Sequence, residues 1–197
     1  MVITAYLSIG STYTYLTALR LRSVIESQDA AFDFKPFSVR AIMREMNNIP
    51  FPPEKKAKVA YMWRDIERRA ARYGLPAPQL PAPYPLEHFD RANHVGIVAN
   101  REGWYLDYFE ATYRAWFVGG IPAGSEESIS KVCQQLGQSE AALLKGAAQP
   151  DVQETYERNT AEAMAAGVFG APSFVVGQDV FWGDDRLEDA LAASLGA

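Results

Sequence analysis

The residues best suited to chemistry lie where a predicted strand ends and a helix begins. Residues 5–18 read A-Y-L-S-I-G-S-T-Y-T-Y-L-T-A, with Ser11 at this junction. A hydroxyl at the start of a helix lies among unpaired backbone N–H groups and near the positive end of the helix dipole, where an anion binds well. Ser11 therefore either belongs to an anion site or only caps the helix, which is the commoner use of such a serine.

A second motif lies near the end of the sequence. Residues 167–176 read G-V-F-G-A-P-S-F-V-V, in which Pro172 precedes a predicted strand and follows the small residue Ala171. The Ala171–Pro172 bond is a candidate cis peptide, and the alternative is a proline that simply begins a strand.

A third motif, F-W-G-D-D-R-L, occupies residues 181–187. Gly183 permits a turn at this point. Asp184 or Asp185 then either caps the last helix, which is the commoner role, or receives an ammonium group from a ligand.

The hydrophobic pattern predicts the elements that position these motifs. A strand over 2–7, a helix over 12–28 and a strand over 31–38 form a β-α-β opening, which favours parallel strands joined by a right-handed crossover. Two short strands around Gly177 form a hairpin, and a helix over 186–195 follows. Between these two parts the pattern predicts a proline-rich loop over 75–85 and helices over 41–46, 54–73, 89–102, 105–118, 125–137, 139–148 and from Pro150 to Gly167.

This order predicts an α/β protein with a thioredoxin-like fold and a large all-helical insertion after the second strand. Residues 1–38 and 151–197 would form the thioredoxin-like domain, and residues 39–150 the helical insertion domain. Proteins of this fold carry a C-x-x-C pair where this chain has Ser11-Thr12-Tyr13-Thr14. A dithiol oxidoreductase is therefore nearly excluded, and any thiol must come from a bound molecule.

The same fold gives the proline motif a role. A cis proline there faces the start of the first helix, and the preceding residue turns its N–H and C=O towards a peptide-like ligand, as in strand addition. The sequence thus predicts that Ser11 and Ala171 face each other across one site.

Composition limits the classes of function. The chain has 197 residues, 48% of them hydrophobic, and a net charge of −5, which argues against a nucleic-acid partner. The single cysteine, Cys133, is expected to be buried and inert. We expect no metal at His88 and His94, no signal peptide and no membrane span, and hence a cytoplasmic protein.

These motifs together resemble the 2-hydroxychromene-2-carboxylate isomerases and the kappa-class glutathione transferases, from the DsbA-like branch of the thioredoxin fold. The resemblance rests on Ser11, Tyr15 and Leu16 in the first motif, on K-A-K-V-A-Y-M-W-R-D-I-E-R-R-A-A-R-Y-G-L-P, and on most of the two terminal motifs. Thr12 stands where the family has proline, and Gly10 where it has a bulkier apolar residue.

The resemblance implies glutathione as cofactor and a role for each matching position. Ser11 would hydrogen-bond the glutathione sulfur, and Thr12 and Tyr84 would contact the second substrate. The remaining implied glutathione-binding residues are Asn48, Lys58, Ala171, Pro172, Trp182, Gly183, Asp184 and Asp185.

The resemblance also implies a reaction, in which a bound thiolate adds to an enone-like carbon of a small unsaturated aromatic carboxylate, allows a bond to rotate and leaves again. The alternatives are a kappa-like glutathione transferase and a glutathione-binding protein without turnover. The resemblance allows a homodimer. Most aromatic residues of the helical segment would be core, with a few lining a cleft for a flat substrate: Trp104, Tyr105, Tyr108, Phe109, Tyr113, Trp116 and Phe117.

Overall fold

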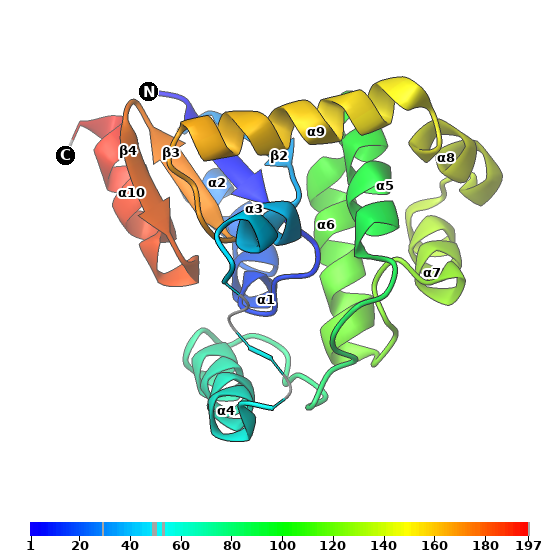
Figure 1. Cartoon of the computed structure of the whole chain (residues 1–197), viewed down its shortest axis with the longest axis horizontal. Helices are drawn as coiled ribbons and strands as arrows, with labels where there is room; N and C mark the ends of the chain where they lie inside the picture. Colours follow the sequence, from blue (N-terminus) through cyan, green and yellow to red (C-terminus); the bar gives the residue numbers. More distant parts are fainter. Residues whose placement is uncertain (29, 49–50, 53, 197) are drawn as a thin grey trace.

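A mixed four-stranded sheet lies at the centre of the computed structural model, which describes residues 1–28, 30–48, 51–52 and 54–196 (Figure 1). Its strands are β1 (Ile3–Leu7), β2 (Phe32–Pro36), β3 (Ser173–Val176) and β4 (Asp179–Trp182), in the order β2-β1-β3-β4. β1 and β2 are parallel, which confirms the expected β-α-β opening, and the other two pairs are antiparallel. The predicted hairpin is also confirmed, with Gly177 at a φ of 62° in its turn.

Both faces of the sheet are covered. Ile3, Ala5 and Leu7 of β1 are fully buried on one face, in a cluster that includes side chains of α1 (Thr14–Ala18) and α10 (Leu187–Leu195). Tyr6 and Val175 belong to a second cluster with side chains of α3 (Val39–Glu45) and α9 (Pro150–Ala165). This alternation follows from the period of two in a strand, which turns successive side chains to opposite faces.

The predicted helix over 12–28 is wrong as a single element. It divides into α1 and α2 (Leu21–Ser27), separated at Leu19 and Arg20. The Arg20 N–H bonds the Thr17 carbonyl three residues back, and its φ of −110° departs from helical geometry. The Arg20 side chain turns inward to the Asp184 carbonyl and Glu188, a tertiary contact that overrides the local helical pattern.

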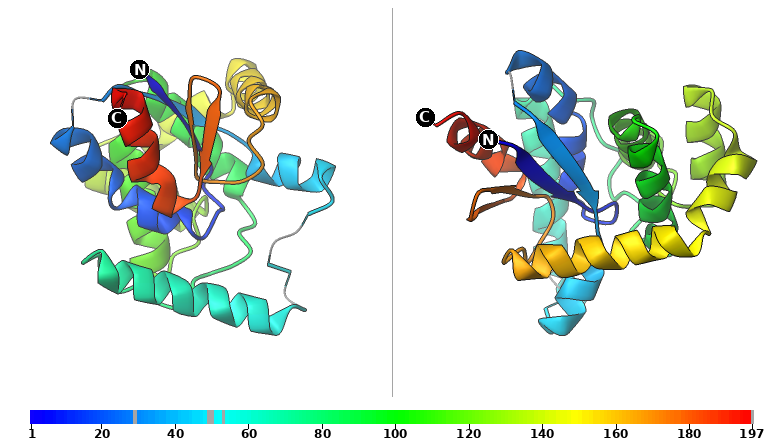
Figure 2. Two further views of the ribbon diagram at one scale, coloured as in Figure 1. Left: turned by 90° about the vertical axis from the view of Figure 1, so that its left-hand side faces the viewer. Right: turned by 90° about the horizontal axis from the view of Figure 1, so that it is seen from above.

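The helical segment between β2 and α9 agrees with the predicted series, with small shifts at the ends. Besides α3 it contains α4 (Lys56–Arg72), α5 (Phe89–Arg101), α6 (Tyr105–Tyr113), α7 (Glu126–Leu136) and α8 (Glu140–Ala147). The expected helix over 105–118 ends in a π-helical turn, η1 (Arg114–Val118). Figure 2 shows α9 crossing the molecule to return the chain to β3, while α4 lies apart from the sheet.

Buried side chains connect the sheet with the helical segment. One cluster contains Ile3 and Leu7 of β1, Phe109 of α6 and Trp116 of η1, all fully buried. Cys133 on α7 is buried and forms no disulfide, as expected. None of the helices formed by the described residues is both long and apolar enough to cross a membrane.

Candidate active site

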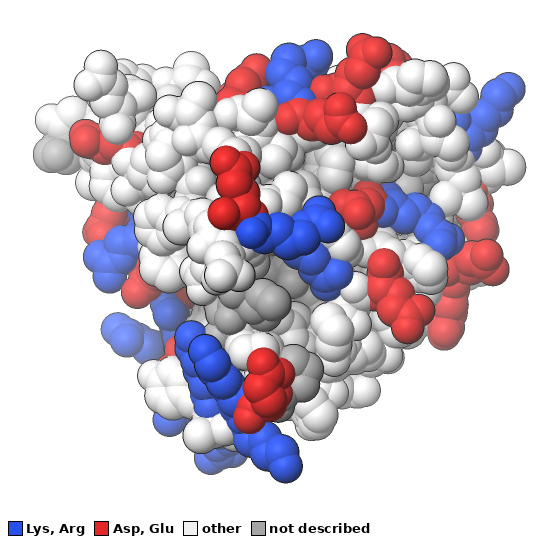
Figure 3. All heavy atoms as spheres, in the orientation of Figure 1, with Lys and Arg blue, Asp and Glu red and all other residues white. Residues whose placement is uncertain are grey.

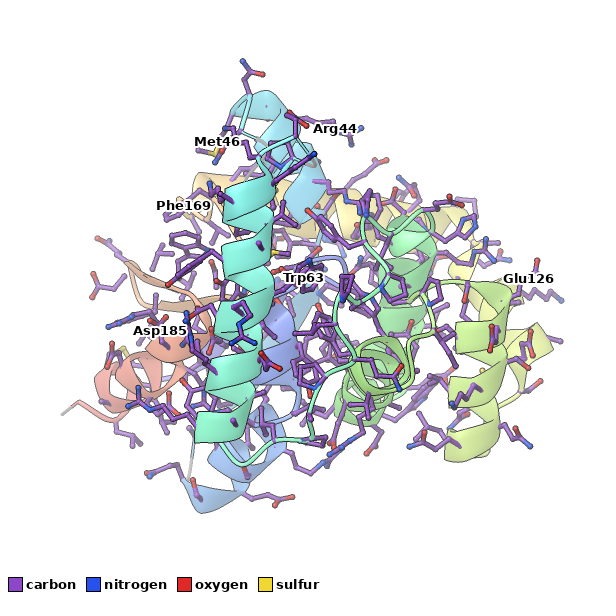
Figure 4. All side chains as sticks on the ribbon, turned by 90° about the horizontal axis from the view of Figure 1, so that it is seen from below. Arg44, Met46, Trp63, Glu126, Phe169 and Asp185 are labelled. Atoms are coloured by element: carbon purple, nitrogen blue, oxygen red, sulfur yellow. The ribbon has the colours of Figure 1, made fainter. Side chains whose placement is uncertain are left out.

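A cavity of about 750 Å³ lies between the start of α1, helix α3 and helix α4. Its lining includes Ser11, Ala171 and Asp185, which come from opposite ends of the chain. Figure 4 shows α4 crossing this region, with Phe169 and Asp185 along one of its sides and Arg44 near its N-terminal end. The cavity therefore brings the three sequence motifs to one place.

The loop that carries Ser11 is fixed by two side chains of the helical segment. Asn93 on α5 accepts from the Ile9 N–H and donates to the Ile9 carbonyl, both at 2.8 Å. The Tyr113 hydroxyl on α6 donates its single proton to a shared hydrogen bond with two carbonyls, those of Ser11 at 2.9 Å and Ser8 at 3.1 Å. Because Asn93 and Tyr113 are buried, these hydrogen bonds to the loop are shielded from water.

The Ser11 hydroxyl donates to the Ala171 carbonyl at 2.7 Å. The alternative role of Ser11 as a helix cap is wrong, because α1 begins after Tyr13 and has no side-chain cap. Ala171–Pro172 is cis, as expected. The Ala171 N–H has no acceptor among the described residues. Ser11 and Ala171 thus face each other, and both line the cavity.

Gly10 and Thr12, the two neighbours of Ser11, have structural constraints of their own. Gly10 has a φ of +133°, and an added Cβ would lie 3.4 Å from the Cβ of Phe89, so a larger residue is strained there. Thr12 lines the cavity, but its hydroxyl donates to the Met62 sulfur at 3.1 Å. That hydroxyl therefore binds α4 to the loop.

Asp184 is buried among cations. Its Oδ2 lies 2.8 Å from Arg69 Nη2 and 3.9 Å from Arg20 Nη1. These contacts are ion pairs, since no N–H of the described residues is directed at Oδ2. Burial raises the pKa of Asp184 to about 6, Arg69 and Arg20 oppose the rise, and neighbouring Asp185 adds to it.

The expectation that Asp184 or Asp185 caps the last helix is wrong. The helical turn η2 (Asp184–Arg186) and α10 both lack a side-chain cap. Asp185 is exposed, 3.3 Å from Arg186 and 3.9 Å from Arg69. An exposed carboxylate at the edge of the cavity is the one of the two that a ligand can reach.

Trp182 and Gly183 form the wall next to Ala171. The Trp182 ring is about half-exposed and packs against Phe169, with ring centroids 4.8 Å apart. It also covers Gly170, where an added Cβ would lie 2.3 Å from the indole nitrogen. Gly183 has a φ of 116° and donates its N–H to the Pro172 carbonyl at 3.0 Å.

Asn48, Lys58 and Tyr84 also line the cavity. Lys58 is exposed, with its ammonium 5.3 Å from the centre of the Phe51 ring. Tyr84 is half-buried with its ring edge against Trp63. All eleven site residues predicted from the sequence therefore lie around one cavity.

Most aromatic residues of α6 and η1 are core, as expected, but the expectation that a few of them line the cleft is wrong. Those helices bury their aromatic rings in the core to fill the space between α1, α5 and α7. The aromatic lining comes instead from Tyr13, Phe51, Tyr84, Phe89, Phe169 and Trp182. Among the described residues, no three His, Cys, Asp or Glu side chains are placed to hold a metal ion.

Three arginines of the site are not among the residues predicted from the sequence, although Arg69 lies within the stretch K-A-K-V-A-Y-M-W-R-D-I-E-R-R. Arg20 and Arg69 contact Asp184, and Arg40 lines the cavity from α3. Arg20 and Asp184 are 164 residues apart in the chain, and a pairing at that separation leaves no local pattern.

Comparisons with known proteins identify the family of this chain. The family model for the DSBA-like thioredoxin domain matches residues 2–194, and the chain therefore belongs to this family. It is 27% identical over 185 residues to the 2-hydroxychromene-2-carboxylate isomerase of Sphingobium xenophagum, covering 93% of this chain and 92% of the relative. The isomerase of Pseudomonas putida is 24% identical over 189 residues, with coverages of 95% and 91%.

Solved structures similar to this chain also include a 2-hydroxychromene-2-carboxylate isomerase. A structure of 2-hydroxychromene-2-carboxylate isomerase superposes with a TM-score of 0.85 at 25% identity, covering all of this chain and 95% of the other. The cytosolic disulfide reductase DsbM of Pseudomonas aeruginosa, solved with GSH, has a TM-score of 0.66 at 14% identity, with both chains fully covered. The second similarity shows the fold alone, whereas the first extends the isomerase resemblance to the whole structure.

Proposed function

We propose that this protein is a glutathione-dependent cis–trans isomerase of the 2-hydroxychromene-2-carboxylate type, acting on an unsaturated aromatic carboxylate. The observation that carries this proposal is the Ser11 hydroxyl beside Ala171 in the cavity. From the fold resemblance, Ser11 would occupy the place of the thiol in dithiol members of the fold, and the single cysteine, Cys133, is buried on α7. The isomerase relatives supply the reaction class.

The cavity has suitable partners for a γ-glutamyl peptide. The Ala171 N–H without an acceptor is the kind of backbone group that pairs with an extended peptide. Asp185 at the cavity edge suits an ammonium group, and Lys58 suits a carboxylate. Bound glutathione would supply a thiolate that adds reversibly to an unsaturated carbon.

Ser11 would stabilise that thiolate. Its hydroxyl donates to a neutral carbonyl in this structure, and a donor bonds an anion more strongly than a neutral acceptor. The backbone N–H groups of Thr12 and Tyr13 also have no acceptor among the described residues and lie beside Ser11. Together these donors favour the charged form of a nearby thiol.

The test is to follow isomerisation of 2-hydroxychromene-2-carboxylate with and without trace glutathione. We expect no reaction above background without glutathione and many turnovers per glutathione with it. Ser11→Ala should lower kcat/KM about 100-fold, the typical effect of removing one donor to developing charge. Ser27→Ala, an exposed serine on α2, is the matched control and should leave the rate unchanged.

Two other results would replace the proposal. Stoichiometric loss of glutathione with an electrophile would indicate a kappa-like transferase. Glutathione binding without any turnover would indicate a binding protein.

A further inference from the structure

Arg40 on α3 is a cation of the cavity without an anionic partner. Its guanidinium carbon lies 3.8 Å from the centre of the Phe89 ring. No carboxylate oxygen of the described residues lies within 4.0 Å of it, and no hydrogen bond from it is present among them. By contrast, Arg69 in the same cavity lies 2.8 Å from Asp184. Arg40 is therefore placed to accept an anion from outside the chain.

The surroundings of Arg40 do not satisfy its charge. Burial lowers the pKa of the guanidinium, with smaller opposing effects from Tyr84, Asp90 and Tyr156 and an adverse one from Arg44. The Asp90 carboxylate accepts a hydrogen bond from the Tyr156 hydroxyl at 2.9 Å. A half-buried cation without a bonded anion is costly, and a bound carboxylate would offset that cost.

The stacking on Phe89 fixes how Arg40 can bind. A guanidinium that lies over an aromatic ring keeps the N–H groups at its edge available, and these match the two oxygens of a carboxylate. The neighbouring lining is largely apolar, with Val39, Met43 and Pro85. These side chains would contact an aromatic ring of a ligand whose carboxylate binds Arg40.

The Arg40–Phe89 pair also lies close to Ser11. Gly10, the residue before Ser11, lies against Phe89, while Ser11 itself bonds Ala171. Ser11 thus stands between the Arg40 end of the cavity and the end formed by Ala171 and Asp185. Figure 3 shows Lys and Arg side chains over α3 near the middle of this face of the molecule.

We propose that Arg40 is a specificity-determining residue that binds the carboxylate of the second substrate, at the end of the cavity opposite Asp185. The identity of the substrate rests on the proposed isomerase function. The observations that make Arg40 an anion-binding residue do not depend on that function. It assigns the two ends of the cavity to two ligands, with glutathione near Asp185 and the aromatic carboxylate near Arg40.

The test compares an acid with its neutral counterpart. KM is measured for an aromatic enone carboxylate and for the corresponding primary amide, in the wild type and in Arg40→Gln. We expect Arg40→Gln to raise KM for the acid about 10- to 100-fold, as for loss of a charge-assisted hydrogen bond, and to leave KM for the amide within about twofold. Arg40→Lys should restore part of the preference, because it keeps the charge but not the planar fork.

Binding without turnover separates this proposal from the proposed function. Cinnamate and cinnamamide are titrated by calorimetry against the same variants, with a thermal melt to confirm that each is folded. If the wild type shows no isomerisation but prefers cinnamate in an Arg40-dependent way, the function is wrong and the Arg40 site stands.

Two controls sharpen the result. Arg44 is an exposed arginine on the same helix, and Arg44→Gln should change cinnamate affinity much less than Arg40→Gln does. Arg158→Gln on α9 should leave cinnamate affinity unchanged. The proposal is overturned if Arg40→Gln weakens the binding of cinnamate and cinnamamide equally, or if Arg44→Gln lowers cinnamate affinity as much as was expected of Arg40→Gln. It is also overturned if Arg40→Gln weakens glutathione binding and not cinnamate binding.

Discussion

At the residue scale, Asp184 shows how burial sets the behaviour of one group in the site. Its carboxylate is enclosed between Arg69 and Arg20, yet burial outweighs both cations and raises its pKa to about 6. The protonated form is therefore favoured in the folded state relative to the unfolded chain. Asp184 consequently contributes to stability at low pH, and that contribution is lost as the pH rises.

This behaviour predicts a pH dependence of stability. The folded protein binds the Asp184 proton more tightly than the unfolded chain, so the free energy of unfolding falls as pH rises from 3.8 to about 6. The expected fall is about 3 kcal/mol. Urea unfolding at several pH values in this range should show it in the wild type.

The variant Asp184→Asn should lose this component of the slope, because it cannot titrate. Asp179→Asn, an exposed carboxylate on β4, is the control and should keep the wild-type slope. If Asp184→Asn and the wild type show the same slope, the carboxylate does not titrate as described.

At the scale of elements, the site depends on a loop that the helical segment holds. Asn93 of α5 and Tyr113 of α6 bond the backbone from Ser8 to Ser11. The sequence identified Ser11, because a strand followed by a helix leaves a local pattern. It did not identify Tyr113, which is one of several aromatic residues on a buried helix and differs from them only in its tertiary contact.

The shared hydrogen bond of Tyr113 to the Ser8 and Ser11 carbonyls leads to a prediction that separates stability from activity. Tyr113→Phe should lower the free energy of unfolding by about 1–2 kcal/mol and reduce kcat/KM about tenfold, because the Ser11 loop loses its support. Tyr108→Phe is the matched control, since its buried hydroxyl also donates to a backbone carbonyl, that of Ala92. It should show a similar loss of stability with unchanged activity.

Denaturant unfolding and steady-state kinetics on both variants provide the measurement. Equal activities in Tyr113→Phe and Tyr108→Phe would contradict the role of Tyr113 in positioning Ser11.

The break between α1 and α2 and the aromatic lining of the cavity are two features that the sequence did not predict. The order of helices and strands was predictable because each has a strong hydrophobic period, and the fold followed from that order. The break at Arg20 was not predictable from the sequence, because it depends on Asp184 and Glu188 near the other end of the chain. The aromatic lining was misassigned for a related reason, since a helical pattern shows that a face is buried but not which surface it meets.

At the scale of the whole molecule, the distribution of charge supports an anionic ligand. The chain carries a net charge of −5. The cavity is nevertheless lined by four cations, Arg40, Arg44, Lys58 and Arg69, and by three carboxylates, Asp90, Asp184 and Asp185. Among the described residues, the cavity thus has one more cation than carboxylate although the whole chain is acidic, which favours a negative ligand locally and not through the overall field.

The continuous buried cluster predicts that sheet and helical segment unfold together. It includes Ile3 of the sheet and Trp116 of η1, so the two parts share one core. Two variants that keep only Trp116 or only Trp182 would report from the two parts, and their fluorescence midpoints in urea should coincide. Separate midpoints would indicate that residues 39–150 fold as an independent unit.

The role of Ser11 as the partner of the glutathione sulfur is tested most directly by an ultraviolet titration of the thiolate of bound glutathione. The titration compares the wild type, Ser11→Ala and Ser27→Ala. A hydrogen bond to a charged group contributes about 1.5–3 kcal/mol, which corresponds to about one to two pKa units. We expect the bound thiol to have a pKa below that of free glutathione in the wild type and Ser27→Ala, and a value raised by that amount in Ser11→Ala. A thiol pKa that is the same in Ser11→Ala as in the wild type would contradict the assignment of Ser11 as the partner of the sulfur.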